Sequence, residues 1–204
     1  MRRVLFLRHG SHDRLGRILC GRMPGVSLSE AGRAEARIVA AALARRFSGA
    51  LAGETVSLLS SPQPRTRETA APLAEALGIG AEVAEELDEI AFGDWTGKAF
   101  SELDGDPAWT AWNTQRGSAR PPGGESMGAV QARVGGLLDR LAAEEGPPVI
   151  LVSHGDPIRA ALLGVLGLPL DAYDRIVVAP VSCSELELWP GGGRVVSINE
   201  RLAG

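Results

Sequence analysis

Two segments of the chain share a pattern in which a short apolar run ends at a histidine followed by a glycine. They are VLFLRHG at residues 4–10 and VILVSHG at residues 149–155. Such runs are typical of strands buried on both faces of a sheet, and open α/β sheets bind ligands beyond the carboxyl ends of their strands. We therefore expect His9 and His154 to arrive at one edge of a sheet and to face each other.

A third apolar run, residues 56–59, leads into a Ser-Ser-Pro turn and then to Arg65 in the first turn of an expected helix. Arg8 precedes the first histidine, so two arginines and two histidines would form a compact cationic pocket suited to a phosphate dianion. Gly10 and Gly155 would let the backbone turn sharply and approach a ligand closely. Taken singly, each of these residues is more often structural or solvated. The repetition at two strand ends is what favours a binding site.

The elements that must position these residues alternate along the chain. Helix-prone stretches and further strands can be placed between and after the three apolar runs, and residues 81–90 are expected to be extended. Helices are expected at residues 30–47, 62–77, 125–145 and 157–166, short helices over 99–116, and late strands at 176–178, 184–189 and 195–198, the last two joined by a turn at 191–193. This alternation predicts one three-layer α/β/α domain over residues 1–204, with a mostly parallel central sheet.

Composition excludes several classes of function. The chain has 204 residues and a formal charge of −4, from 21 basic and 25 acidic residues, so it offers no general attraction to nucleic acid or to an anionic membrane. No stretch approaches the length of a membrane span, and the apolar run at the N-terminus is too short for a signal peptide. Cys20 and Cys183 are expected to be isolated thiols in a reducing compartment, which predicts a cytoplasmic protein. Lys98 is the only lysine, so nearly every cation is an arginine that can clamp an anion in a bidentate way.

The chain resembles the histidine phosphatase superfamily, also called the phosphoglycerate mutase-like clan. The resemblance rests on six blocks that follow the family's order across residues 4–159. They are Arg8-His9-Gly10, the segment from Gly21-Arg22 to Gly32, Ser60 to Ala70, Leu87 to Gly97, Gly123 to Ser126, and Val152 to Arg159. The triplet alone would be weak, but six ordered blocks imply a phosphoglycerate mutase-like fold.

The resemblance also implies an activity, phosphomonoester hydrolysis through a phosphohistidine on a small phosphorylated metabolite. His9 would be the nucleophile, while Arg8, Arg65 and His154 would hold the phosphoryl oxygens. Glu89 would protonate the leaving group and then activate water. No metal and no other cofactor is expected, because the arginines would take the part that a magnesium ion often plays.

Several residues compete for the role of the general acid, since Glu89 lies in an acidic cluster with Glu85, Glu86 and Asp88. Glu89 is chosen because it stands three residues before Phe92-Gly93, as the family glutamate does. A shift of one residue, to Asp88, is left open.

The loop after the triplet departs from the family. Where the family often has Glu or Gln, then Ser or Thr, and later an Asn that contacts phosphate, this chain has Ser11, His12 and Leu15. Leu15 cannot donate a hydrogen bond, so His12 is a candidate to replace that contact. An exposed loop histidine is an equal alternative. Ser11, His12 and Arg22 complete the predicted substrate-binding residues, together with Gly10, Gly155, Arg8, Arg65 and His154.

Two other functions are compatible with the motifs. One is a phosphoglycerate-type mutase, although mutases of this clan usually carry an insertion and a tail that the compact chain lacks. The other is an inactive phospho-ligand-binding protein, which the departures at Ser11 and Leu15 keep open. Substrate choice is expected to lie in residues 99–122, where Trp109 and Trp112 are interpreted as core. The expected partner is a small-molecule phosphomonoester, with no nucleic acid and no membrane, and a homodimer is left open.

Overall fold

Six strands form one mixed sheet at the centre of the computed structural model, which describes residues 1–50 and 56–202. The strand order across the sheet is β3-β2-β4-β1-β5-β6. The strands are β1 (Arg2–Arg8), β2 (Ser57–Ser60), β3 (Ala81–Val83), β4 (Val149–Ser153), β5 (Cys183–Trp189) and β6 (Gly192–Glu200). The first four strands in the sequence, β1, β2, β3 and β4, form only parallel pairs with one another, whereas β5 and β6 add an antiparallel edge. The predicted, mostly parallel sheet is confirmed.

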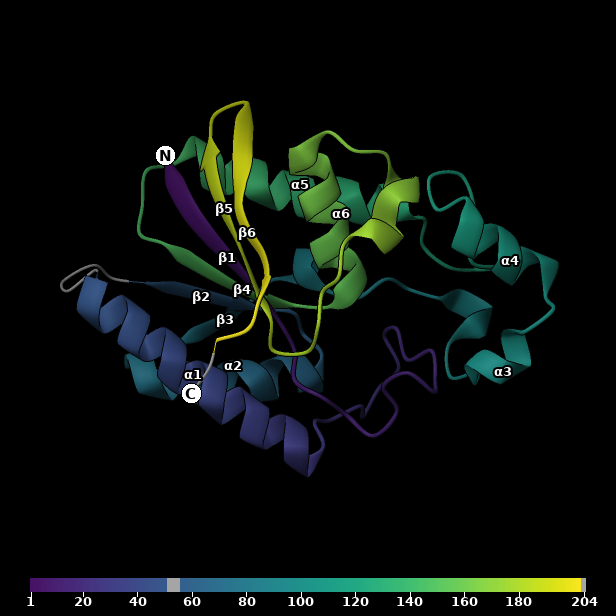
Figure 1. Ribbon diagram of the computed structural model, residues 1–204, viewed down its shortest axis with the longest axis horizontal. Coiled ribbons are helices and arrows are strands. Elements are labelled where there is room, and N and C mark those ends of the chain that lie inside the picture. Colours follow the sequence, from purple (N-terminus) through teal and green to yellow (C-terminus); the bar gives the residue numbers. More distant parts are fainter. Residues whose placement is uncertain (51–55, 203–204) are drawn as a thin grey trace.

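Helices cover both faces of this sheet, which gives the predicted three layers (Figure 1). α1 (Glu30–Ala50) and α2 (Pro64–Leu77) lie on one face, and α5 (Met127–Ala143) and α6 (Gly155–Leu166) lie on the other. The short helices α3 (Phe100–Leu103) and α4 (Pro107–Thr114) lie beyond the end of the sheet. Short 3-10 helices occur at η1 (Glu85–Leu87), η2 (Gly93–Trp95) and η3 (Leu170–Arg175).

The two cores explain why the central strands are apolar without alternation. Val4 and Phe6 of β1 belong to the core under α5 and α6, whereas Leu5 and Leu7 belong to the core under α1 and α2. Because successive side chains of a strand point to opposite faces, a strand covered on both faces must be apolar at every position. Trp112 is fully buried in the first core and Trp109 packs against it, which confirms the interpretation of the tryptophans as core.

The strand predicted at residues 176–178 is wrong. This segment follows η3 as irregular extended chain, because its carbonyl groups bond to arginine side chains instead of a neighbouring strand. Arg159 donates from Nε to the carbonyl of Ile176 at 3.0 Å, and Arg8 donates from Nη1 to the carbonyl of Val178 at 2.5 Å. Apolar composition predicted a strand here, but side-chain donors satisfy the backbone.

The loop that follows β1 is fixed at both ends. It pairs with the segment before α3, since the Leu19 amide donates to the Lys98 carbonyl at 2.9 Å. At the start of α1, the backbones of Gly10 and Gly32 pack so closely that a Cβ on Gly10 would lie 2.7 Å from the Gly32 carbonyl oxygen. The glycine after the first histidine is therefore required by packing against a helix. Ser29 caps that helix by accepting from the Gly32 amide at 3.0 Å.

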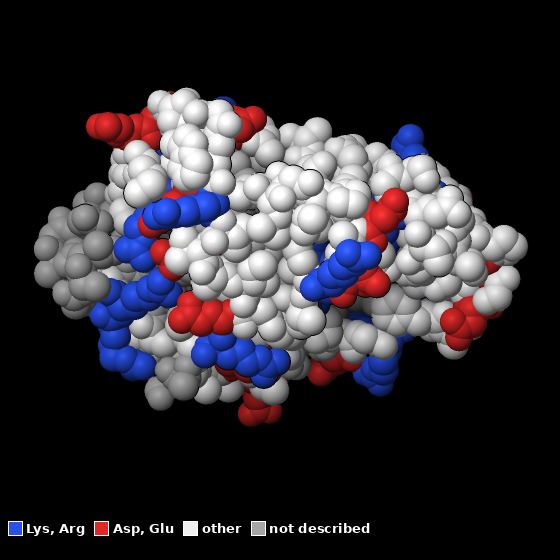
Figure 2. Space-filling view, turned by 45° about the horizontal axis from the view of Figure 1, so that its top comes forward, with Lys and Arg blue, Asp and Glu red and all other residues white. Residues whose placement is uncertain are grey.

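The surface is mixed in charge. Figure 2 shows groups of charged side chains on the face in view, in which acidic and basic residues lie next to one another. Wide uncharged areas separate these groups. Across residues 1–50 and 56–202, no helix combines the length and apolar character needed to cross a bilayer.

We expect Gly32→Ala to destabilise the fold. The new Cβ would lie 1.9 Å from the carbonyl oxygen of Ser11, which is itself held by two hydrogen bonds from Ser29 and cannot yield easily. Overpacking of this kind lowers the free energy of unfolding by about 1–3 kcal/mol, measured by urea denaturation.

Gly135→Ala is the matched control in α5, where nothing lies within 4 Å of the added Cβ. It should leave stability unchanged or raise it by about 0.5–1 kcal/mol, because glycine is unfavourable inside a helix. Equal stability of Gly32→Ala and wild type would contradict the close contact.

Candidate active site

Three parallel strand ends meet at the site, as predicted. β4 lies between β1 and β2, and its last residues receive hydrogen bonds from both neighbours. The His9 amide donates to the Ser153 carbonyl at 3.0 Å, and the Ser61 amide donates to the Val152 carbonyl at 3.0 Å. The sheet ladder thus fixes the height at which each loop leaves its strand, and it brings the two histidine-bearing loops side by side.

His9 is buried and its ring has a defined orientation. Its Nδ1 lies 2.8 Å from the carbonyl oxygen of Gly10, so in the neutral ring Nδ1 carries the proton and donates it there. Nε2 then keeps its lone pair. Burial, together with the charges of Arg65 and Arg8, holds the pKa of His9 well below its usual value. The neutral, nucleophilic form is therefore the stable one at neutral pH.

Two arginines are anchored in the pocket by backbone carbonyls. Arg65, 1% exposed, donates from Nη2 to the Gly21 carbonyl at 2.7 Å, and Arg8 donates to Val178 as described above. Among the described residues, the buried Nε of Arg8 and the buried Nε and Nη1 of Arg65 have no hydrogen-bond partner. A carbonyl anchor fixes the guanidinium without neutralising its charge, so both cations remain available to an anion.

Two more buried nitrogens lack partners within the part of the chain that is described. They are Nδ1 of His12 and Nδ1 of His154. The ring centroids of these histidines lie 5.5 Å and 5.1 Å from that of His9, so the three rings form one cluster. Burial, Arg65 and Arg8 lower the pKa of His12 to about 4 and hold the pKa of His154 well below its usual value. With the arginines, these nitrogens suit an anion with several oxygens.

The pocket between these groups has a volume of about 160 Å³. Its lining combines charged and polar side chains with apolar ones. The lining residues that matter most are Arg8, His9, His12, Leu15, Ile18, Arg65, Glu89, Phe92, Phe100, Gly155, Asp156 and Arg159. Gly155 is the first residue of α6, whose positive N-terminal end adds to the attraction for an anion.

Glu89 provides the one acidic side chain of the acidic cluster that lines the pocket. Its Oε1 accepts from the Ile90 amide at 3.0 Å. Burial, and then the charge of Asp156, raise the pKa of Glu89 to about 7 against the opposing effect of Arg65. A carboxyl group with a pKa near neutrality can both give and take a proton.

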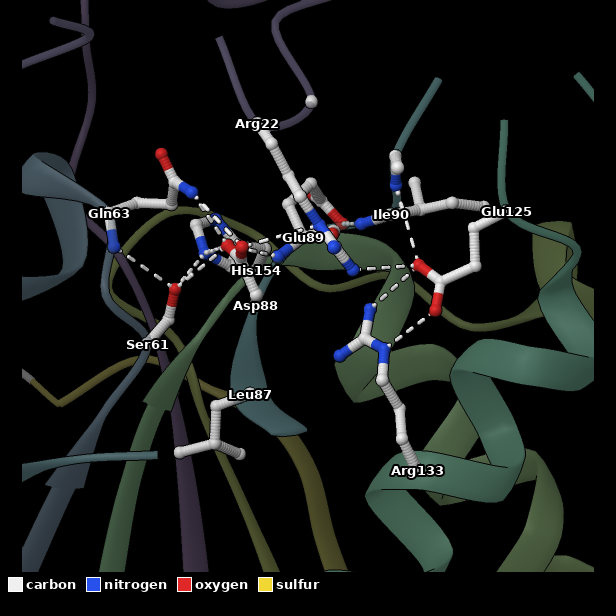
Figure 3. A network of polar contacts seen from close by, with 12 residues as sticks. Arg22, Ser61, Gln63, Leu87, Asp88, Glu89, Ile90, Glu125, Arg133 and His154 are labelled. Carbon is white, nitrogen blue, oxygen red and sulfur yellow. Dashed lines mark hydrogen bonds and ion pairs between the residues drawn. The ribbon is translucent and has the colours of Figure 1, made fainter. Parts of the chain in front are cut away.

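Asp88 is not among the residues that line the pocket and belongs to a polar network (Figure 3). Its Oδ1 accepts from the Glu89 amide at 2.8 Å and from Nε2 of Gln63 at 2.9 Å. Nε of Arg22 lies 3.2 Å from Oδ2. Asp88 is therefore committed to holding the segment, and the geometry favours Glu89 over Asp88 as the group that can reach a ligand.

Four of the predicted residues, Gly10, Ser11, Arg22 and His154, are not among the residues that line the pocket. Arg22 bonds to the Glu89 carbonyl at 2.7 Å and to Glu125 at 2.9 Å, so it fixes the acidic segment. Both the amide and the hydroxyl of Ser11 bond to Glu35, at 2.8 and 3.0 Å. The Gly10 amide donates to Oγ1 of Thr69 at 3.0 Å. These groups hold the loop, and their predicted substrate contacts stay predictions.

Several residues of the site were not singled out from the sequence. Asp156 and Arg159 line the pocket and form an ion pair at 3.2 Å, and Arg116, stacked on Trp112 and Tyr173, also reaches Asp156. Asp156 and Arg159 could have been found from the sequence, because they are a polar pair close behind the second histidine, His154.

The comparisons with known proteins identify the family of the chain. The sequence matches the histidine phosphatase superfamily (branch 1) over residues 4–201. The chain belongs to this superfamily, and its predicted family and fold are confirmed.

The similar proteins include phosphatases. The glucosyl-3-phosphoglycerate phosphatase of Mycobacterium tuberculosis (strain CDC 1551 / Oshkosh) is 34% identical over 98% of this chain and 92% of its own. A solved mycobacterial glucosyl-3-phosphoglycerate phosphatase in complex with VO3 aligns with a TM-score of 0.83 and 30% identity, covering 98% of this chain and 100% of that one. These relatives agree with the predicted enzyme class, a phosphoric monoester hydrolase.

The chain spans about half the length of other relatives. A bifunctional protein of Mycobacterium tuberculosis (strain ATCC 25618 / H37Rv) is 32% identical over 96% of this chain, which covers 53% of that protein.

We expect His12→Ala to weaken the binding of inorganic phosphate by about tenfold, because one buried charge-assisted hydrogen bond is worth roughly 1.5–3 kcal/mol before relaxation. His12→Asn keeps a donor on a shorter side chain and should recover part of the affinity. Titration calorimetry with inorganic phosphate measures both. Unchanged affinity in His12→Ala would show that His12 is a bystander, and Glu82→Gln on the exposed strand β3 serves as the control.

Proposed function

We propose that the chain is a phosphomonoester hydrolase that passes a phosphoryl group from a small metabolite to His9 and then to water. The observation that carries the proposal is the convergence of two arginines, each with unpartnered nitrogens among the described residues, and a cluster of three neutral histidines, two of which line the pocket. A phosphate dianion supplies the charge and the oxygen acceptors that these groups lack.

In the first step Nε2 of His9 attacks phosphorus, and the bond from phosphorus to the ester oxygen breaks. The hydrogen bond from Nδ1 to Gly10 orients the ring for this attack and stabilises the positive charge that the phosphorylated ring acquires. Arg8 and Arg65 bind the equatorial oxygens, where charge is spread in the transition state. Nδ1 of His154 and of His12 face the same oxygens.

Glu89 gives its proton to the leaving alkoxide in that step. In the second step the resulting carboxylate takes a proton from water, whose oxygen attacks phosphorus and releases His9 and inorganic phosphate. A pKa of about 7 suits both roles, because neither form of the carboxyl group is costly to reach at neutral pH.

The substrate class that fits is a small phosphorylated metabolite. The pocket of about 160 Å³ accommodates the phosphate group and little more, so the rest of the substrate lies against the mouth. Phe92 and Phe100 offer apolar surface there, and Arg159 offers a cation. Glucosyl-3-phosphoglycerate, which the 34% identical relative is named for, belongs to this class.

Other properties stay predictions from the sequence. They are a cytoplasmic location, the lack of a nucleic-acid or membrane partner, a homodimer, a single domain over residues 1–204, and independence from metals and other cofactors.

We expect the wild-type protein to hydrolyse p-nitrophenyl phosphate in the presence of a metal chelator and to form an acid-labile, base-stable phosphoryl adduct. His9→Ala should lose both the adduct and the turnover, because the proposed mechanism uses the free Nε2 of His9 as the attacking atom. Quenched labelling and release of inorganic phosphate measure the two.

An adduct that persists in His9→Ala would place the nucleophile elsewhere. Absence of turnover and adduct across a panel of phosphomonoesters would favour a phospho-ligand-binding protein. Conversion of 3-phosphoglycerate to its 2-isomer, in place of phosphate release, would favour a mutase.

We expect Glu89→Gln to lower kcat for an alkyl phosphate by about 10²–10⁴, because the leaving alkoxide then receives no proton. The loss should be smaller for p-nitrophenyl phosphate, whose leaving group needs little help. In the wild type, kcat/KM for the alkyl ester should fall above about pH 7 as Glu89 ionises, and this limb should vanish in the variant. Asp88→Asn is the comparison, and an equal loss of kcat there, again larger for the alkyl ester than for p-nitrophenyl phosphate, would reverse the assignment.

A further inference from the structure

A buried chain of polar groups lies behind His154, on the side that the proposed mechanism does not use (Figure 3). Oγ of Ser61 lies 2.8 Å from Nε2 of His154 and 3.3 Å from Oδ1 of Asp88. His154 and Ser61 are fully buried and Asp88 is 5% exposed. The opposite ring nitrogen, Nδ1, is buried without a partner among the described residues, and the ring centroid lies 5.1 Å from that of His9.

When the His154 ring is neutral, the protons shared by Ser61, Asp88 and His154 are too few to leave one on Nδ1 of the ring. Ser61 has a single hydroxyl proton, and donating it to Asp88 leaves its oxygen to accept a proton from Nε2 of His154. A neutral ring that is protonated at Nε2 presents a lone pair at Nδ1. That lone pair would repel a phosphate oxygen, and a second proton on the ring removes the repulsion.

We propose that Ser61 and Asp88 are positioning residues that hold a proton on Nε2 of His154, so that a bound phosphate draws a second proton from solvent onto Nδ1. His154 then becomes an imidazolium between the phosphate on one side and, through Ser61, the Asp88 carboxylate on the other. The proton returns to solvent when phosphate leaves, and no covalent bond to His154 forms. The inference rests on the phosphate pocket of the proposed function.

The charges around His154 make the ring respond to the ligand. Burial, and then Arg65, His9, Arg8 and Arg133, keep the pKa of His154 well below its ordinary value while the pocket holds no anion. A phosphate dianion offsets the two arginines that line the pocket. Asp88 then contributes the second negative charge, at 3.9 Å from Nε2.

Asp88 is held so that it can serve in this way. The Glu89 amide and Gln63 donate to its carboxylate, and Arg22 pairs with it at 3.2 Å, so these contacts fix the position of the group. Arg133 is itself paired with Glu125 at 2.9 Å, so it does not compete for Asp88. Asp88 thus reaches the phosphate only through Ser61 and His154.

The chain suits a direct test because it contains only three histidines. Long-range ¹H–¹⁵N spectra of the ¹⁵N-labelled protein report the protonation of each ring nitrogen, and His9→Ala and His12→Ala assign the signals. With saturating inorganic phosphate at neutral pH, both nitrogens of His154 should be protonated in the wild type. Without phosphate, only Nε2 should be.

In Asp88→Asn and in Ser61→Ala, we expect His154 to carry a single proton with phosphate bound, and the affinity for phosphate to fall by about tenfold. The affinity should also lose its increase towards lower pH. Gln63→Leu is the matched control, because it removes two hydrogen bonds to Asp88 but leaves the carboxylate charge, and it should keep the doubly protonated ring.

The outcomes separate the two proposals. Phosphate that shifts the His9 signals while His154 stays neutral in the wild type would overturn the role of Asp88 and leave the proposed function standing. A doubly protonated His154 in both Asp88→Asn and Ser61→Ala would overturn it as well. Phosphate that shifts no histidine signal would remove the pocket on which both proposals depend. If one variant fails to fold, the other carries the same test.

Discussion

The site depends on two guanidinium groups that are buried against backbone carbonyls instead of carboxylates. Arg65 is anchored by Gly21 and Arg8 by Val178, and each anchor takes one donor without cancelling the charge. The positive potential that remains explains the other groups. Together with burial, which has the larger effect, it keeps the neighbouring histidines neutral, and it makes an anionic Glu89 tolerable although burial and Asp156 still raise the pKa of Glu89. A pocket with this balance is completed only by a ligand that brings negative charge and several acceptor oxygens.

The fold supplies these anchors through its irregular parts. The parallel ladder of β1, β4 and β2 determines where His9, Ser61 and His154 leave the sheet. The carbonyls that hold the arginines come from the loop after β1 and from the extended chain after η3. A regular strand at residues 176–178 would have used the Val178 carbonyl in a ladder, so the absence of pairing there is part of how the site is built.

Local patterns in the sequence predicted much of this arrangement, but not all of it. The apolar runs placed His9 and His154 correctly because the height of a loop at a sheet edge follows from where its strand ends. The segment 176–178 was wrong because a β-prone composition does not reveal that side-chain donors will satisfy its carbonyls. Ser11 and Arg22 turned towards Glu35 and Glu125, partners 24 and 103 residues away. The contact between Ser61 and Asp88 was not predicted for the same reason, since pairing across 27 residues depends on the folded chain.

The separate anchoring of the arginines and of His9 has an evolutionary consequence. The ring of His9 depends on the carbonyl of its own neighbour, Gly10, whereas each arginine depends on a distant loop. Loss of an arginine would therefore release a segment of backbone, but loss of the His9 ring would remove one side chain and leave the cationic cradle assembled. In the mechanism proposed above, a single codon change at position 9 would remove the nucleophile and leave a site that still binds phosphorylated metabolites. Within such a lineage, sensing could arise from hydrolysis without any rebuilding of the fold.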